Sequence, residues 1–117
     1  MPRYVSPSSP MPKKLATMTE ILGIPQLRAE ILRFLSQHPD GATSGEIAAA
    51  IGTRYQTVQR HLEQLEELKA VKASVKPPRQ GHHVVFKIKP NVLAEAVEKN
   101  ASYIQGHSDT PNKPRPT

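Results

Sequence analysis

Residues 43–68 read TSGEIAAAIGTRYQTVQRHLEQLEEL, and this stretch decides the fold. Its apolar residues recur at helical spacing on both sides of Gly52. They are Ile47, Ala48 and Ile51 before the glycine, and Val58, Leu62, Leu65 and Leu68 after it. Two amphipathic helices that meet at one glycine are typical of a helix-turn-helix, because glycine readily adopts the backbone conformation that ends a helix.

The second helix, predicted from about Arg54 to Leu68, has chemically different halves. On a helical wheel of 100° per residue, Gln56 and Arg60 lie opposite the apolar stripe. No acid occurs between Thr53 and Leu62, and the acids of this helix all follow: Glu63, Glu66 and Glu67. A helix that enters the groove of a polyanion with its first half requires this asymmetry, because phosphates repel carboxylates. The pattern therefore predicts a face that reads nucleic acid.

Two further helices are predicted before this stretch. Residues 13–22 carry apolar side chains at helical spacing, namely Leu15, Met18 and Leu22. A helix that begins with Pro25 and stops before Pro39 has one apolar face, made of Leu27, Ile31, Phe34 and Leu35. Residues 39–41 (PDG) are typical of a turn, and they separate this helix from the helix-turn-helix.

The helix after that turn is expected to end at Gly52 and to have a polar cap at its start. Thr43 or Ser44 can provide the cap, and Glu46 is favourable in the first turn. Ser44 is followed three residues later by Ile47, so a cap at Ser44 lacks the full capping box.

After residue 70 the apolar pattern changes from a helical period to alternation. Apolar and polar residues alternate over 71–76 and again over 84–89, and a basic segment rich in Pro and Gly lies between them. This predicts a two-stranded hairpin with a basic tip. A last helix is expected over residues 91–104, with its apolar stripe at Leu93, Val97, Ala101 and Ile104. The predicted fold is mainly α with a small β-hairpin, hence α+β.

Composition restricts the class of protein further. At 117 residues the chain has room for one domain, expected over residues 13–104 with its core at 25–89. The arm at residues 1–12 and the tail at 105–117 are expected to be disordered. Absence of cysteine excludes disulfides, Cys-ligated metals and thiol catalysis. No apolar run reaches the roughly 18 residues of a membrane span, and no secretory signal is evident, so a cytoplasmic protein is expected.

The net charge of +6 is concentrated in two places. Residues 1–20 have three basic side chains against one acid, and residues 76–90 have four basic side chains and no acid. Elsewhere the charges cancel. A focused basic segment attracts a polyanion more strongly than the same charge spread evenly, although a charge cluster can also be a solvated surface.

The order helix, helix, helix, hairpin, helix is that of a winged helix-turn-helix. Over residues 25–104 the chain resembles the bacterial winged-helix regulators of the arsenical-resistance and multiple-antibiotic-resistance (ArsR/MarR-like) type. The residues that carry the resemblance are Glu46-Ile47-Ala48, Ile51-Gly52, Thr57-Val58, Arg60-His61-Leu62, Leu65-Glu66 and Val71, followed by the hairpin. The resemblance implies a DNA-binding regulator, commonly a homodimer, with a recognition helix in the major groove and a wing on the backbone or minor groove. Metal-sensing members use cysteine ligands, which this chain lacks.

Candidate DNA contacts follow from side-chain chemistry. Arg60 can bind guanine O6 and N7, and Gln56 or Gln59 can bind adenine N6 and N7. Contacts to a phosphate or a base edge are expected near the helix starts and on the wing, from Thr43, Ser44, Arg54, Tyr55, Thr57, Lys76, Arg79 and Gln80. The alternative for each residue is an ordinary exposed polar side chain.

Three functions are compatible with these residues. The first is sequence-specific double-stranded DNA binding by a transcriptional regulator, most simply a repressor at the nucleoid. The second is a plasmid or phage DNA-binding protein with an architectural, replication or partition role. The third is a winged helix that binds an acidic protein partner. A homodimer is expected through the last helix, and residues 15–22 are a second candidate contact.

Enzyme activity is not expected, and neither is a metal or cofactor. No catalytic set of Ser, His and Asp, no paired carboxylates and no Gly-rich phosphate loop is evident. His82 and His83 are adjacent, and adjacent residues on a strand point to opposite faces, so they are poorly placed to share one ion.

Overall fold

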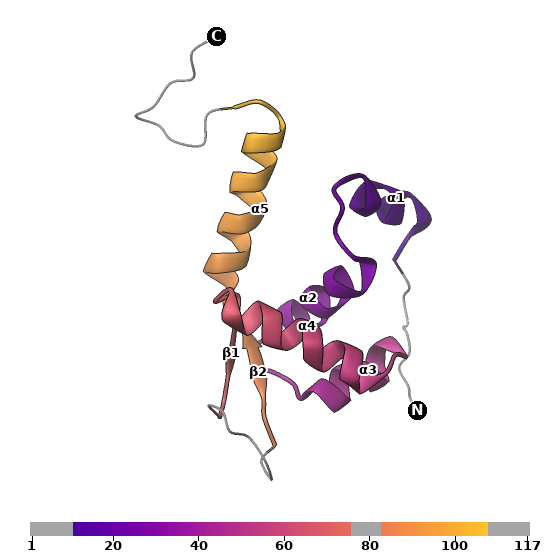
Figure 1. Ribbon diagram of the computed structural model, residues 1–117, viewed down its shortest axis with the longest axis vertical. Coiled ribbons are helices and arrows are strands. Elements are labelled where there is room, and N and C mark those ends of the chain that lie inside the picture. Colours follow the sequence, from indigo (N-terminus) through magenta and orange to yellow (C-terminus); the bar gives the residue numbers. More distant parts are fainter. Residues whose placement is uncertain (1–10, 76–82, 108–117) are drawn as a thin grey trace.

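The computed structural model describes residues 11–75 and 83–107, and these form five helices and one two-stranded sheet (Figure 1). In chain order the elements are α1 (Lys13–Ile21), α2 (Gln26–Gln37), α3 (Ser44–Ile51), α4 (Tyr55–Glu67), β1 (Val71–Ala73), β2 (Phe86–Ile88) and α5 (Pro90–Ile104). The predicted order of elements is confirmed. Most of the predicted arm and tail, and the predicted wing tip, lie outside the described residues.

The start of α3 corrects the expectation of an incomplete capping box. Thr43 is the N-cap, and its hydroxyl oxygen accepts the N–H of Glu46 at 3.1 Å. The carboxylate of Glu46 in turn accepts the N–H of Thr43 at 2.9 Å. The expectation was wrong because it counted the box from Ser44, one residue too late. The start of α2 also differs from the expectation by one residue, because Pro25 precedes the helix as its N-cap and is not its first residue.

The end of α4 explains how the chain turns sharply into β1. Lys69 follows the last residues of the helix with a φ of 69°. The N–H of Ala70 donates to the carbonyl of Leu65 at 2.8 Å, and the N–H of Lys69 donates to that of Glu66 at 2.9 Å. These two bonds form the Schellman motif, which normally has glycine at the left-handed position. The motif places β1 directly beside the helix that it follows.

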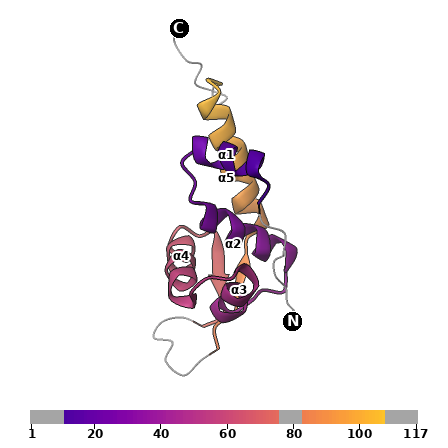
Figure 2. The ribbon, with the colours of Figure 1, turned by 90° about the vertical axis from the view of Figure 1, so that its right-hand side faces the viewer.

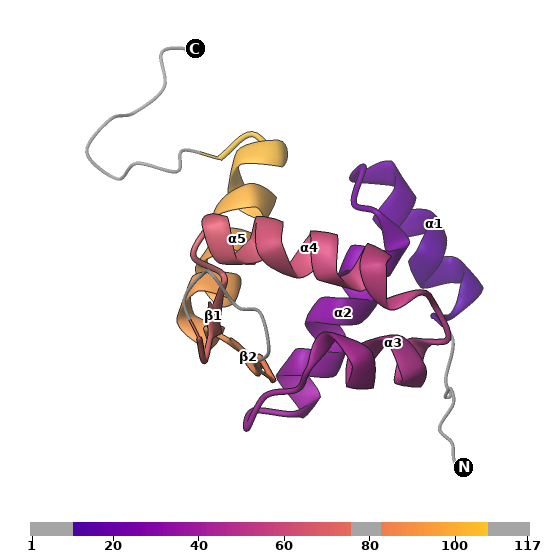
Figure 3. The same ribbon diagram turned by 60° about the horizontal axis from the view of Figure 1, so that its bottom comes forward.

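One aliphatic core joins α2, α3, α4 and the sheet. Its fully buried side chains are Phe86, Ile31, Leu35, Ile47, Leu62, Val58 and Val71. Figure 3 shows α3 and α4 in front of α2, in the arrangement of a helix-turn-helix braced by a third helix. Val58, Leu62 and Leu65 are all buried, which confirms the apolar stripe of α4 over these residues, whereas Leu68 at the C-cap is 65% exposed.

The sheet contains a contact that alternation did not predict. β1 and β2 pair antiparallel, with Val71 opposite Ile88 and Ala73 opposite Phe86. On its other side, Phe86 pairs with Ala42 of the loop before α3. The N–H of Ala42 donates to the carbonyl of Phe86 at 3.0 Å, and the N–H of Phe86 donates to the carbonyl of Ala42 at 2.8 Å. The α2–α3 loop is thereby fastened to the hairpin.

The strands are shorter than the alternation predicted. Ladder pairing stops at Ala73 and Phe86, although the apolar alternation continues to Val75 and begins at Val84. At the next position the hydroxyl oxygen of Ser74 accepts the N–H of Val85 at 2.9 Å. The N–H of Ser74 still donates to the carbonyl of Val85 at 2.9 Å, so a side chain replaces only one of the two backbone hydrogen bonds at this position, which alternation of apolar residues does not reveal.

The first and last helices lie at the edge of the core, and of α5 only Leu93 packs partly against it. Neither α1 nor α5 has a buried residue. Figures 1 and 2 show both at the end of the molecule opposite the hairpin, with α5 extending away from the other elements. None of the helices in the described ranges combines the length and the apolar character needed to cross a membrane.

Gly41→Ala should destabilise the protein by about 2–4 kcal/mol, measured by urea unfolding. Gly41 has a φ of +95°, and a Cβ there would lie 2.6 Å from Cγ1 of Val85 and 2.8 Å from the carbonyl oxygen of Phe86. Both strain and a clash oppose the substitution. Gly45→Ala is the control, because its Cβ meets nothing closer than 3.9 Å. A stability of Gly41→Ala equal to that of the control would contradict the close approach of the loop to β2.

Candidate nucleic-acid interface

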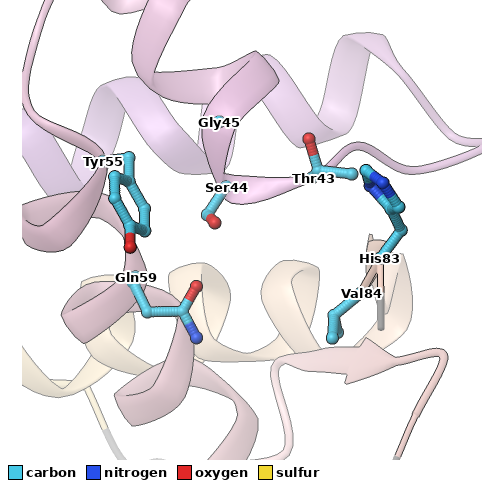
Figure 4. Close-up of a pocket in the computed structure, with 7 residues that line it drawn as sticks. All are labelled: Thr43, Ser44, Gly45, Tyr55, Gln59, His83 and Val84. Carbon is cyan, nitrogen blue, oxygen red and sulfur yellow. The ribbon is translucent and has the colours of Figure 1, made fainter. Parts of the chain in front are cut away.

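A groove of about 470 Å³ lies where the start of α3, the first half of α4 and the base of the hairpin meet. It is lined by Thr43, Ser44, Gly45, Tyr55, Gln59, His83 and Val84. Figure 4 shows Tyr55 and Gln59 on one side and Thr43 and His83 on the other, with the Ser44 side chain pointing into the space between them. Four predicted contact residues from two helices are therefore brought together with the wing.

The α3 end of this groove carries backbone donors. The capping box uses the N–H groups of Thr43 and Glu46. The N–H groups of Ser44 and Gly45 belong to the first turn, where no earlier carbonyl of the helix is available. They make no hydrogen bond to any other residue within 11–75 and 83–107. Such N–H groups at a helix start are a favourable position for an anion such as a phosphate.

The first half of α4 presents polar side chains to solvent. Arg54, Gln56 and Arg60 are exposed, and Tyr55 is 55% exposed. Thr57 and Gln59 are half-buried. Because Arg60 follows Gln59 by about 100° around the helix, it projects beside the groove and does not line it. The predicted outward orientation of Gln56 and Arg60 agrees with their exposure.

The remaining predicted contacts are Lys76, Arg79 and Gln80, and all three lie outside the described residues. Sequence reasoning did not assign His83, Val84 or Gly45 to the interface. Sequence reasoning considers His82 and His83 only as metal ligands, whereas His83 lines the groove beside Thr43 (Figure 4). The signal that could have placed them is the hairpin itself, because its second strand must return alongside the helix-turn-helix.

A polar cluster on the other side of α4 connects this helix to α2. Nε of Arg28 donates to Nδ1 of His61 at 3.1 Å, and its Nη2 donates to Oε1 of Gln64. Burial of the imidazole ring, together with the positive charges of Arg28 and Arg60, lowers the pKa of His61 from its ordinary value of 6.5. His61 thus belongs to the brace between two helices, and Arg28 is a residue that sequence reasoning did not single out.

Comparisons with known proteins identify the fold. Residues 27–72, from α2 to β1, match a family of helix-turn-helix domains. A mutant of S. aureus MepR bound to an oligodeoxyribonucleotide is similar in structure, with a TM-score of 0.55 and 21% identity over 82% of this chain and 75% of the other. No curated protein sequence matches this chain at a significant level.

A second solved structure, of a MarR family transcription regulator, has a TM-score of 0.50 and 23% identity, and it is matched over 77% of this chain and 63% of its own length. At these identities the similarity concerns the fold. Five helices, the hairpin and their order make this fold a winged helix-turn-helix, as predicted.

Stability should fall as the pH drops through 6.5, more steeply in the wild type than in His61→Gln. The neutral ring is favoured in the folded state, where it accepts the N–H of Arg28. As the pH falls, the unfolded chain therefore binds a proton near pH 6.5 and the folded chain only at a lower pH, which favours unfolding. Urea unfolding at pH 7.5 and at lower pH values measures the effect.

The same substitution at exposed His107, outside the Arg28–His61 pair, is the control for the loss of an imidazole. Parallel pH profiles for wild type and His61→Gln would show that His61 is not held neutral by the fold.

Proposed function

Because the chain has a winged helix-turn-helix fold of the MarR type, we propose that it binds double-stranded DNA and regulates transcription. The observation that supports this most strongly is the groove, which combines the N–H groups of Ser44 and Gly45 with the acid-free first half of α4. A similar structure, the MepR mutant, is bound to an oligodeoxyribonucleotide.

In this proposal α4 enters the major groove with its N-terminal half. Arg60 reads a guanine, and Gln56 or Gln59 reads an adenine. The phosphate backbone passes the start of α3, where Thr43 and Ser44 stand beside the donors, and Arg54, Tyr55 and Thr57 contact backbone or base edges near the start of α4. Lys76, Arg79 and Gln80, which lie between β1 and β2 in the sequence, contribute further backbone contacts. Repression by occlusion of a promoter, at the nucleoid in the cytoplasm, is the simplest role for such a protein.

We further propose a homodimer. The exposed apolar side chains of α1, its C-cap Leu22 and α5 include Leu15 (45%), Met18 (48%), Ile21 (76%), Leu22 (53%), Val97 (62%) and Ile104 (57%). Leu93 packs partly against the protein's own core, so the free part of the α5 stripe begins at Val97. Covering these surfaces with a second copy buries them and places two copies of α4 on one duplex, about 34 Å apart.

Val97→Asp should convert the dimer to a monomer and weaken binding to a two-half-site duplex by about a hundredfold, because the second contact is no longer intramolecular. Val97 is 62% exposed, so the substitution is compatible with folding. Analytical ultracentrifugation gives the mass, and fluorescence anisotropy gives the affinity. Ser102→Asp, about 140° further round α5, is the control and should remain dimeric. A monomeric wild type, or a dimeric Val97→Asp, would refute the α5 interface.

Arg60→Ala should cost about 1–3 kcal/mol on the preferred site and much less on random duplexes. The preferred site is obtained by selection from random-sequence duplexes, and affinity is then measured over a range of salt concentrations. Arg33→Ala on α2 removes the same charge from an exposed position and is the control. Equal losses on both DNAs would make Arg60 a phosphate contact. The logarithm of the affinity should fall with the logarithm of the salt concentration, with a slope of about −0.9 per phosphate contact. A much shallower slope would favour a protein partner over DNA.

A further inference from the structure

The side chain of Gln59 is held by a neighbour on the same helix. Its Nε2 donates a hydrogen bond to a carboxylate oxygen of Glu63 at 3.0 Å. Residues four apart lie one above the other on a helix, so this bond fixes the amide without distorting α4. Gln59 is half-buried and lines the groove, where its amide oxygen lies on the side of Ser44 (Figure 4).

The bond leaves a defined set of polar groups on Gln59. A carboxamide has two N–H donors and one carbonyl acceptor. Glu63 takes one N–H, so the carbonyl oxygen and the second N–H remain for a ligand. Because a carboxylate can only accept, Glu63 holds the nitrogen end of the amide toward itself and opposes rotation of the amide by half a turn.

From this geometry we infer that Glu63 is a positioning residue that sets Gln59 as the adenine reader of the interface. Adenine presents an N6 donor beside an N7 acceptor in the major groove, which matches the acceptor and the donor left on Gln59. Guanine presents two acceptors there and matches them poorly. This inference rests on the proposed DNA-binding function, and it selects Gln59 over Gln56, whose side chain makes no hydrogen bond within the described residues.

Glu63 is a surprising residue to find near DNA, since its charge alone opposes binding to phosphates. A positioning role therefore has a distinctive signature. Loss of the carboxylate should leave affinity for random duplexes unchanged or raised, while discrimination at one base pair falls. If Glu63 only repelled phosphates or only stabilised the fold, its loss would not lower discrimination at one base pair while leaving affinity for random duplexes unchanged or raised.

The test compares wild type with Glu63→Ala, Glu63→Gln and Glu67→Ala in selection from random-sequence duplexes. Anisotropy is then measured on the selected duplex and on its single-base variants. In Glu63→Ala the preference for adenine at one position should fall about three- to tenfold, the cost of leaving one side chain free to rotate. Glu63→Gln can donate as well as accept, so it no longer opposes rotation of the Gln59 amide and should lose the preference to the same extent as Glu63→Ala. Glu67→Ala removes the same charge one turn further along α4 and should select the wild-type site.

The hydrogen bond itself can be followed by NMR. The side-chain NH2 resonances of Gln59 should move in Glu63→Ala and stay in place in Glu67→Ala. Unchanged NH2 resonances, or an unchanged adenine preference in Glu63→Ala, would overturn the role of Glu63 and leave the proposed function intact. If the preference for adenine fell equally in Glu63→Ala and Glu67→Ala, the effect would come from the lost charge alone, and the positioning role of Glu63 would again be overturned. A wild type without any sequence preference would overturn sequence-specific binding and this inference together.

Discussion

The pair of hydrogen bonds between Ala42 and Phe86 is the contact on which the rest of the interface depends. It joins the loop that starts α3 to the strand that returns from the hairpin. Gly41 makes this approach possible, because any side chain there would collide with β2. Through this one bridge the helix start at Ser44 and the wing residue His83 come to line a single groove.

The interface carries both acidic and basic side chains, and the position of each charge matters more than the net charge. Glu46 completes the α3 cap and Glu63 binds Gln59, so both of these acids near the groove are engaged in local hydrogen bonds. The donors available to a phosphate are backbone N–H groups, and positive charge comes from exposed Arg54, which precedes α4, and from Lys72 and Lys87 of the two strands. Overall attraction to a polyanion and recognition of a base edge are thus assigned to different parts of the surface.

Much of the fold could be predicted from periodicity, because the predicted features depend on local sequence. The stripes of α2 and α4 and the helix stop at Gly52 depend on residues close in sequence, so spacing reveals them. Contacts between distant segments leave no such trace. The Ala42–Phe86 bridge involves a single residue of a loop, and the Arg28–His61 bond spans 33 positions. The bond between Gln59 and Glu63 has regular helical spacing, but sequence reasoning treated Glu63 only as a repulsive charge.

The most direct measurement of the central claim is a titration of the 15N-labelled protein with duplex DNA, followed by the backbone amide resonances. We expect the amides of Ser44, Gly45, Gln59 and His83 to shift or broaden together, while that of Tyr103 on α5 stays in place. Shifts confined to α1 and α5, with no change at the start of α3, would contradict the placement of DNA against the groove between α3, α4 and the hairpin.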